Sequence, residues 1–124
     1  MEQVTLLKQD ECVRLDPARL DELFVQLGQR AAEDVVCRAL EEMAARLSHI
    51  ERCYRAGNMA EMRKNARSLG AIADQLGMPV MARVARDVTA CADSGDPVAL
   101  AATLSRLLRL GERSLTEIWD MQTV

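Results

Sequence analysis

Aromatic side chains are almost missing from this chain of 124 residues, which contains one Phe, one Tyr and one Trp. Three aromatic rings are too few for the stacking platform on which proteins bind single-stranded nucleic acid. The formal net charge of −3 gives no overall attraction for a phosphate backbone. We therefore expect no nucleic-acid partner.

Long apolar runs are lacking as well, because nowhere do 18 apolar residues follow one another. A transmembrane helix needs roughly 20 such residues, so we expect no membrane-spanning segment. The first 16 residues mix charged with apolar side chains and lack the hydrophobic core of a signal peptide. The sequence thus predicts a cytoplasmic protein with no membrane partner.

Potential metal ligands are few and scattered. Cys12, Cys37, Cys53 and Cys91 form no C-x-x-C pair, which is typical of reduced thiols that pack as small hydrophobic side chains. The single histidine, His49, precedes Cys53 by four residues, but two ligands do not make a zinc site. Glycine-rich phosphate loops and Ser-His-Asp sets are also missing. We expect no metal, no cofactor and no catalytic residue.

Turn-forming residues divide the remaining chain into five helical segments. Asp16-Pro17 and Asp96-Pro97 each place a capping carboxylate before a proline at the first helical position. Pro79 starts another helix, and Asn58 caps one. Glycines mark the helix ends, as expected of C-terminal caps, at Gly28, Gly57, Gly77 and Gly95.

Between these marks, apolar residues recur at steps of three and four, the period of a helix with one buried face. The stripe of the segment 30–56 consists of Val36, Leu40, Met43, Leu47, Ile50 and Tyr54. Because the links between the long helices are short, neighbours must run antiparallel. The sequence predicts an all-α, antiparallel up-down-up-down four-helix bundle with a short N-terminal helix. Residues 16–124 form this single domain, and the order of segment 1–15 is left open.

The third helical segment resembles the histidine phosphotransfer (HPt) family. That family's pattern is A-H-x-L-K-G-x-A-x-x-L-G, and the chain matches it in register at Ala66, Leu69, Ala73, Leu76 and Gly77. The hairpin at 56–58 and the turn at 94–96 also resemble the family, so the likeness extends from about Leu15 to Leu115. The resemblance implies the bundle fold and a place in two-component phosphorelay signalling.

Three departures from this pattern fall on the family's chemistry. Arg67 replaces the phosphorylated histidine, Gly70 replaces a lysine, and Ala71 replaces a glycine. A guanidinium is always protonated and offers no free nitrogen lone pair for attack on an aspartyl phosphate. We therefore expect a pseudo-phosphotransfer protein that binds its partner but is not an enzyme.

A helical wheel, at about 100° per residue, places the apolar stripe of this segment roughly 180° to 260° from Arg67, which should therefore point to solvent. The family's partners are receiver domains and histidine kinases. Receiver domains present clustered carboxylates that an arginine can bind bidentately. The resemblance thus implies docking centred on Arg67, with Arg63 and Lys64 as steering charges. The predicted partner-binding face comprises Ala60, Arg63, Lys64, Arg67, Gly70, Ala71 and Asp74.

Three other interpretations stay open. The polar residues Lys64, Asn65 and Asp74 are equally compatible with an ordinary solvated helix face. A true phosphotransfer protein would have to use His49. The third interpretation is a helical domain that self-associates through apolar residues near Trp119 and Met121. The chain could therefore be a monomer or a dimer.

Overall fold

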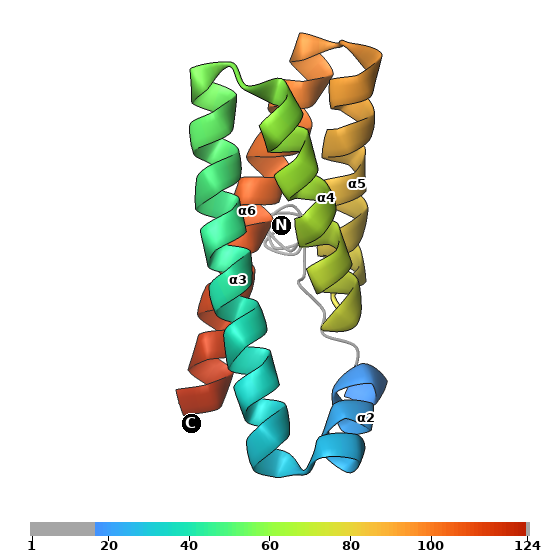
Figure 1. The fold of residues 1–124 in the computed structure, drawn as a ribbon, viewed down its shortest axis with the longest axis vertical. Helices are drawn as coiled ribbons and strands as arrows, with labels where there is room; N and C mark the ends of the chain where they lie inside the picture. Colours follow the sequence, from blue (N-terminus) through green and yellow to red (C-terminus); the bar gives the residue numbers. More distant parts are fainter. Residues whose placement is uncertain (1–16, 124) are drawn as a thin grey trace, which may run out of the picture.

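The computed structural model describes residues 17–123 (Figure 1). Within this range every regular element is a helix: α2 (Pro17–Leu27), α3 (Gln29–Ala56), α4 (Met59–Gln75), α5 (Pro79–Ser94) and α6 (Pro97–Thr123). The all-α prediction is confirmed. The open question about segment 1–15 lies outside the described residues.

The helix ends follow the local chemistry of the turn residues. Gly57 and Gly95 end α3 and α5 in the left-handed conformation, at φ of 78° and 70°, which glycine adopts without strain. Asn58 caps α4 by accepting a hydrogen bond from the backbone N–H of Glu61 at 3.3 Å. Asp96 caps α6 by accepting from two backbone amides of its first turn, each at 3.1 Å. These four residues position the turns at one end of the molecule.

The long helices lie side by side in a bundle-like arrangement (Figure 1). Contacts join α3 to α4, α4 to α5, α5 to α6, and α6 back to α3. Two-residue and three-residue links join α3 to α4 and α4 to α5, so each pair reverses direction at its turn. In the lower part of the view α3 and α6 extend past α4 and α5, and α2 packs against α3.

The predicted apolar stripes form the core between these helices. Burying one such side chain stabilises the fold by about 1.5–3 kcal/mol. The largest fully buried apolar side chains are Met43, Ile50, Met62, Leu69, Met78, Met81, Val84, Val88, Leu107 and Leu110. Met59, the first residue of α4, does not belong to this core, because 37% of its surface is exposed. The stripe of α2 is also incompletely covered, since Phe24 and Leu27 are exposed.

Two glycines lie inside helices at places where neighbouring helices meet. Gly111 of α6 is buried against Leu47 of α3, and Gly70 of α4 is buried against α5. A glycine inside a helix costs about 1 kcal/mol relative to alanine, so its presence calls for a packing reason. The two sites differ in how much space a side chain would find there.

No helix of the described range is long and apolar enough to cross a membrane.

Candidate functional site

Arg67 lies on the outer side of α4, as the helical wheel predicted. Its side chain is exposed and forms no hydrogen bond or ion pair with any described residue. Lys64, one turn before it, is also exposed and its ammonium group is unpaired within the same range. Ala60 and Ala71 are exposed on the same side. The predicted cation on a surface of small side chains is therefore present.

Gly70 does not belong to this surface, which corrects the sequence prediction. The residue is buried because α5 packs against that flank of α4. A Cβ added at Gly70 would lie 3.5 Å from the Cβ of Ala85 and 3.7 Å from the backbone oxygen of Ala82. The glycine thus faces the neighbouring helix and is not available to a partner protein.

Arg63 is paired within the molecule and is not the free steering charge that the sequence predicted. Its Nε and one terminal nitrogen donate to the two carboxylate oxygens of Asp93 on α5, at 2.6 and 2.9 Å. This bidentate geometry is the strong form of an arginine–carboxylate contact. The hydrogen bond from Arg63 lowers the pKa of Asp93, and the same bond raises the pKa of Arg63.

A second ion pair joins α4 to α5 further along the same edge. Asp74 accepts from Arg86 at 3.2 Å, and both side chains are more than half exposed, so this pair contributes little to stability. In each of these pairs the two charges neutralise each other, whereas Lys64 and Arg67 have no ion-pair partner among the described residues. We call this surface the Arg67 face and define it as Ala60, Lys64, Arg67 and Ala71, bordered by the pairs Arg63–Asp93 and Asp74–Arg86.

The Arg63–Asp93 pair predicts a pH-dependent contribution to stability. Because the folded-state pKa of Asp93 is lowered, its contribution is present above the unfolded-state pKa, about 3.9, and is lost as the pH falls through the folded-state value. Asp93→Asn should therefore destabilise the chain at pH 7, and the difference from wild type should shrink below about pH 4.

Urea unfolding at pH 7 and pH 3 measures this effect. Arg63→Gln is the matched control, because adding Asp93→Asn to that variant should cost little further stability. An equal loss at both pH values in the single variant would show that the ion pair is not its cause.

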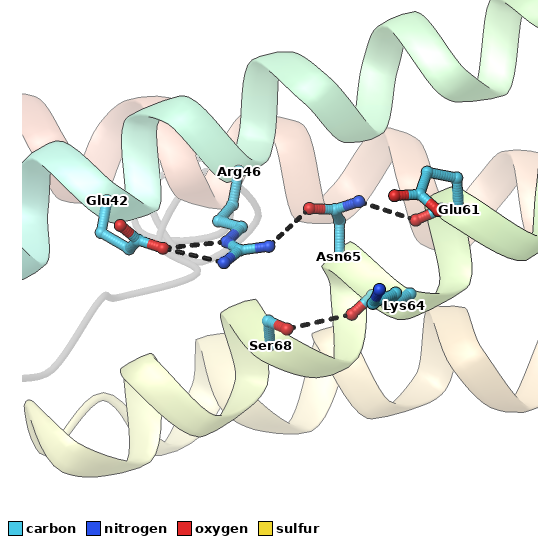
Figure 2. A network of polar contacts seen from close by, with 6 residues as sticks. All are labelled: Glu42, Arg46, Glu61, Lys64, Asn65 and Ser68. Atoms are coloured by element: carbon cyan, nitrogen blue, oxygen red, sulfur yellow. Dashed lines mark hydrogen bonds and ion pairs between the residues drawn. The ribbon is translucent and has the colours of Figure 1, made fainter.

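The opposite flank of α4 carries a polar network that the sequence did not reveal (Figure 2). Asn65 is only 4% exposed, and its Oδ1 accepts a 2.8 Å hydrogen bond from Arg46 of α3. Its Nδ2 donates to the backbone oxygen of Glu61 at 2.8 Å. Arg46 also contacts Glu42, at 3.0 and 2.9 Å. Reading Asn65 as part of a solvated face was therefore wrong.

This network has a consequence for the orientation of Arg67. The wheel angle between Asn65 and Arg67 is about 160°, so the two side chains leave α4 on nearly opposite sides. The side-chain bond from Arg46 fixes which side of α4 faces α3. With Gly70 held against α5 on the other flank, Arg67 is left pointing outward.

Asn65→Ala is expected to lower the free energy of unfolding by about 1 kcal/mol, because it removes hydrogen bonds while Arg46 keeps Glu42 as a partner. Ser68→Ala is the matched control on the same helix, since Ser68 donates only to the backbone oxygen of Lys64 in its own helix (Figure 2). Its expected effect is within about 0.5 kcal/mol. Equal losses in chemical denaturation would contradict a bracing role for Asn65.

His49 lies on α3, away from the Arg67 face, and is half-buried. Its Nε2 is 3.5 Å from Sγ of Cys53, and its Nδ1 is 3.4 Å from a terminal nitrogen of Arg52. Cys53 is buried, whereas the other described thiols, Cys37 and Cys91, are half-buried, and none of these three forms a disulfide bond with another described residue. Phosphotransfer through His49 stays a hypothesis.

The remaining predictions concern Cys12, self-association and metal binding. Cys12 and the side chains of Trp119 and Met121 lie outside the described residues, so the self-association hypothesis stays untested. Across the described part of the chain, His, Cys, Asp and Glu form no group of three that would hold a metal ion.

No protein-family model, curated protein or solved structure matches the chain. Its function therefore has to be inferred from the residues themselves.

Proposed function

We propose that this protein is a non-catalytic, HPt-like regulatory module of two-component signalling. Its helices would form the family's up-down-up-down bundle, and its Arg67 face would dock on a receiver domain or a histidine kinase. The observation that carries this proposal is that Arg67 is exposed and unpaired among the residues that the structure describes. It occupies the register position of the phosphorylated histidine in the sequence pattern, on a face with small neighbouring side chains.

The state of the neighbouring charges favours Arg67 as the central contact. A partner that engaged Arg63 would first have to break a bidentate ion pair, which offsets most of what the new contact contributes. Arg67 has no such internal pair to break within the described range. Its planar guanidinium can donate two parallel hydrogen bonds to one carboxylate, which is the group clustered in a receiver's acidic pocket.

Two further features support close docking. Ala60 and Ala71 flank Arg67 with short side chains, so a partner surface can approach the helix without displacing them. Lys64 adds a second uncompensated positive charge one turn away, which raises the rate of encounter with an acidic surface. A guanidinium has no lone pair to attack a phosphoryl group, so docking would not lead to transfer.

The test uses the full chain and a panel of purified receiver domains and histidine kinases. Isothermal titration calorimetry measures binding, and each receiver is then labelled with a radioactive phosphodonor and mixed with the chain. We expect at least one receiver to bind while the label stays off the chain. If no receiver or kinase binds, the proposal fails. Label that moves to the wild-type chain but not to a His49→Gln variant would instead establish phosphotransfer through His49.

A further inference from the structure

A hollow of about 570 Å³ is lined by residues at or near the α3–α4 and α5–α6 turns. Both turns lie at the same end of the molecule, at the top of Figure 1. Its lining is mainly apolar and includes Met59 of α4, Cys91 of α5, and Pro97 and Leu100 of α6. Met59 is 37% exposed and lines the hollow, so a partner can contact its side chain there. No feature of the proposed function uses it.

The hollow and the Arg67 face both include residues of α4, although they share none. Met59 and Arg67 both belong to α4 and are eight residues apart, which is about 12 Å along the helix axis. Arg63 occupies the turn between them, and its ion pair with Asp93 ties α4 to α5 at that level. A partner protein that covers Arg67 with an interface of ordinary size, about 800 Å² on each side, would reach the hollow as well.

The shape of the hollow favours a projecting side chain over a small ligand. Sites for small molecules enclose 70–90% or more of the ligand, whereas this hollow is open to solvent on one side. A single aliphatic or aromatic side chain needs less enclosure, because the rest of the partner's surface excludes water around it. Methionine adapts its shape readily, so Met59 suits such a contact.

The charges around the hollow indicate what should flank that side chain. Arg55 lines the hollow with 76% of its side chain exposed, and its ion pair with Glu51 one turn earlier is long, at 3.4 Å. Such an exposed pair within one helix is weak and readily exchanged. The carboxylate that lines the hollow, Asp96, accepts hydrogen bonds from two backbone amides at the start of α6. Arg55 beside the hollow and Arg67 about two turns further along α4 are exposed cations that complement carboxylates on a partner.

We propose that the partner of the Arg67 face inserts one aliphatic or aromatic side chain, flanked by carboxylates, into the hollow beside Met59. The inference rests on the proposed function, because it assigns a second anchor to the same partner. The anchor adds affinity and selects among acidic surfaces, since a partner without the apolar side chain leaves the hollow unfilled.

Met59→Glu is the test, measured as the Kd of the best-binding receiver domain of the panel. Met59 is the first residue of α4, where a carboxylate is compatible with the helix dipole, so the variant should fold. We expect Kd to rise by about tenfold or more. Val98→Glu is the matched control, because it adds the same charge to the first turn of α6 at a residue that is 79% exposed and does not line the hollow.

A neutral variant separates apolar contact from charge. Met59→Gln should also weaken binding several-fold, whereas Met59→Leu should bind like wild type. If Met59→Glu weakens binding while Met59→Gln does not, charge alone is responsible and the inserted side chain is refuted. If every Met59 variant binds like wild type while Arg67→Glu does not bind, this inference fails and the proposed function stands. If neither a receiver nor a kinase binds the wild-type chain, both fail.

Discussion

Arg67→Glu is expected to raise the Kd of the receiver complex by about 100-fold or more, which would abolish binding in most assays. The substitution removes the guanidinium and places a carboxylate opposite the carboxylates of the partner. Truncating one member of a buried charge pair costs about 2–5 kcal/mol, and adding a like charge increases that cost. Because Arg67 is exposed and unpaired among the described residues, the chain itself should lose no stability.

Two variants show whether the effect belongs to this face. Arg109→Glu makes the same charge change on an exposed residue of α6, a helix that packs mainly on α3 and α5, and should leave Kd within about twofold of wild type. Arg67→Lys keeps the charge but loses the planar fork, so an intermediate loss of about tenfold is expected. Equal losses from Arg67→Glu and Arg109→Glu would show that only the overall charge matters.

Gly111→Ala is expected to lower the free energy of unfolding by up to about 2 kcal/mol. The added Cβ would overlap Cδ1 of Leu47 and lie 2.9 Å from Cδ2 and 3.2 Å from Cγ of the same side chain. Leu47 is buried and can move only by disturbing the packing between α3 and α6. Overpacking of this kind costs about 1–3 kcal/mol, and the better helix propensity of alanine recovers about 1 kcal/mol.

Gly70→Ala is the matched substitution, with the same gain in helix propensity and the opposite expected sign. Its Cβ would meet Ala85 and the backbone of Ala82 at ordinary van der Waals distances, so stability should rise by up to about 1 kcal/mol. Urea denaturation of both variants measures the two changes. If both glycines respond alike, the tight contact between α3 and α6 is not the reason for Gly111.

The helix boundaries and the orientation of Arg67 were predictable because both depend on local chemistry. Asn58 and Asp96 cap helices through bonds to residues two or three positions away, and Gly57 and Gly95 take the left-handed conformation that ends a helix. A few neighbouring residues of the sequence are therefore enough to predict where such a helix begins or ends. The outward direction of Arg67 likewise follows from the apolar period of a single helix.

The state of the other charges was not predictable, because it depends on which helix lies alongside. Arg63 and Asp93 are 30 residues apart, and nothing local indicates that the packing of α4 on α5 would bring them within 2.6 Å. The burial of Gly70 has the same cause. The wheel position of Asn65, near the apolar stripe, did indicate that this residue could be buried. Its polar side chain nevertheless favours solvent unless a hydrogen-bond partner is known, and the partner, Arg46, lies on another helix.

Mapping the contact surface by NMR tests the central claim most directly. A uniformly 15N-labelled chain is titrated with the best-binding unlabelled receiver domain, and amide shift changes are placed on the structure. The proposed docking predicts the largest changes at α4 residues 60–71 and in the facing part of α5, centred on Arg67. Changes confined to α2, α3 or α6, or a saturating titration that leaves the amides around Arg67 unmoved, would contradict it.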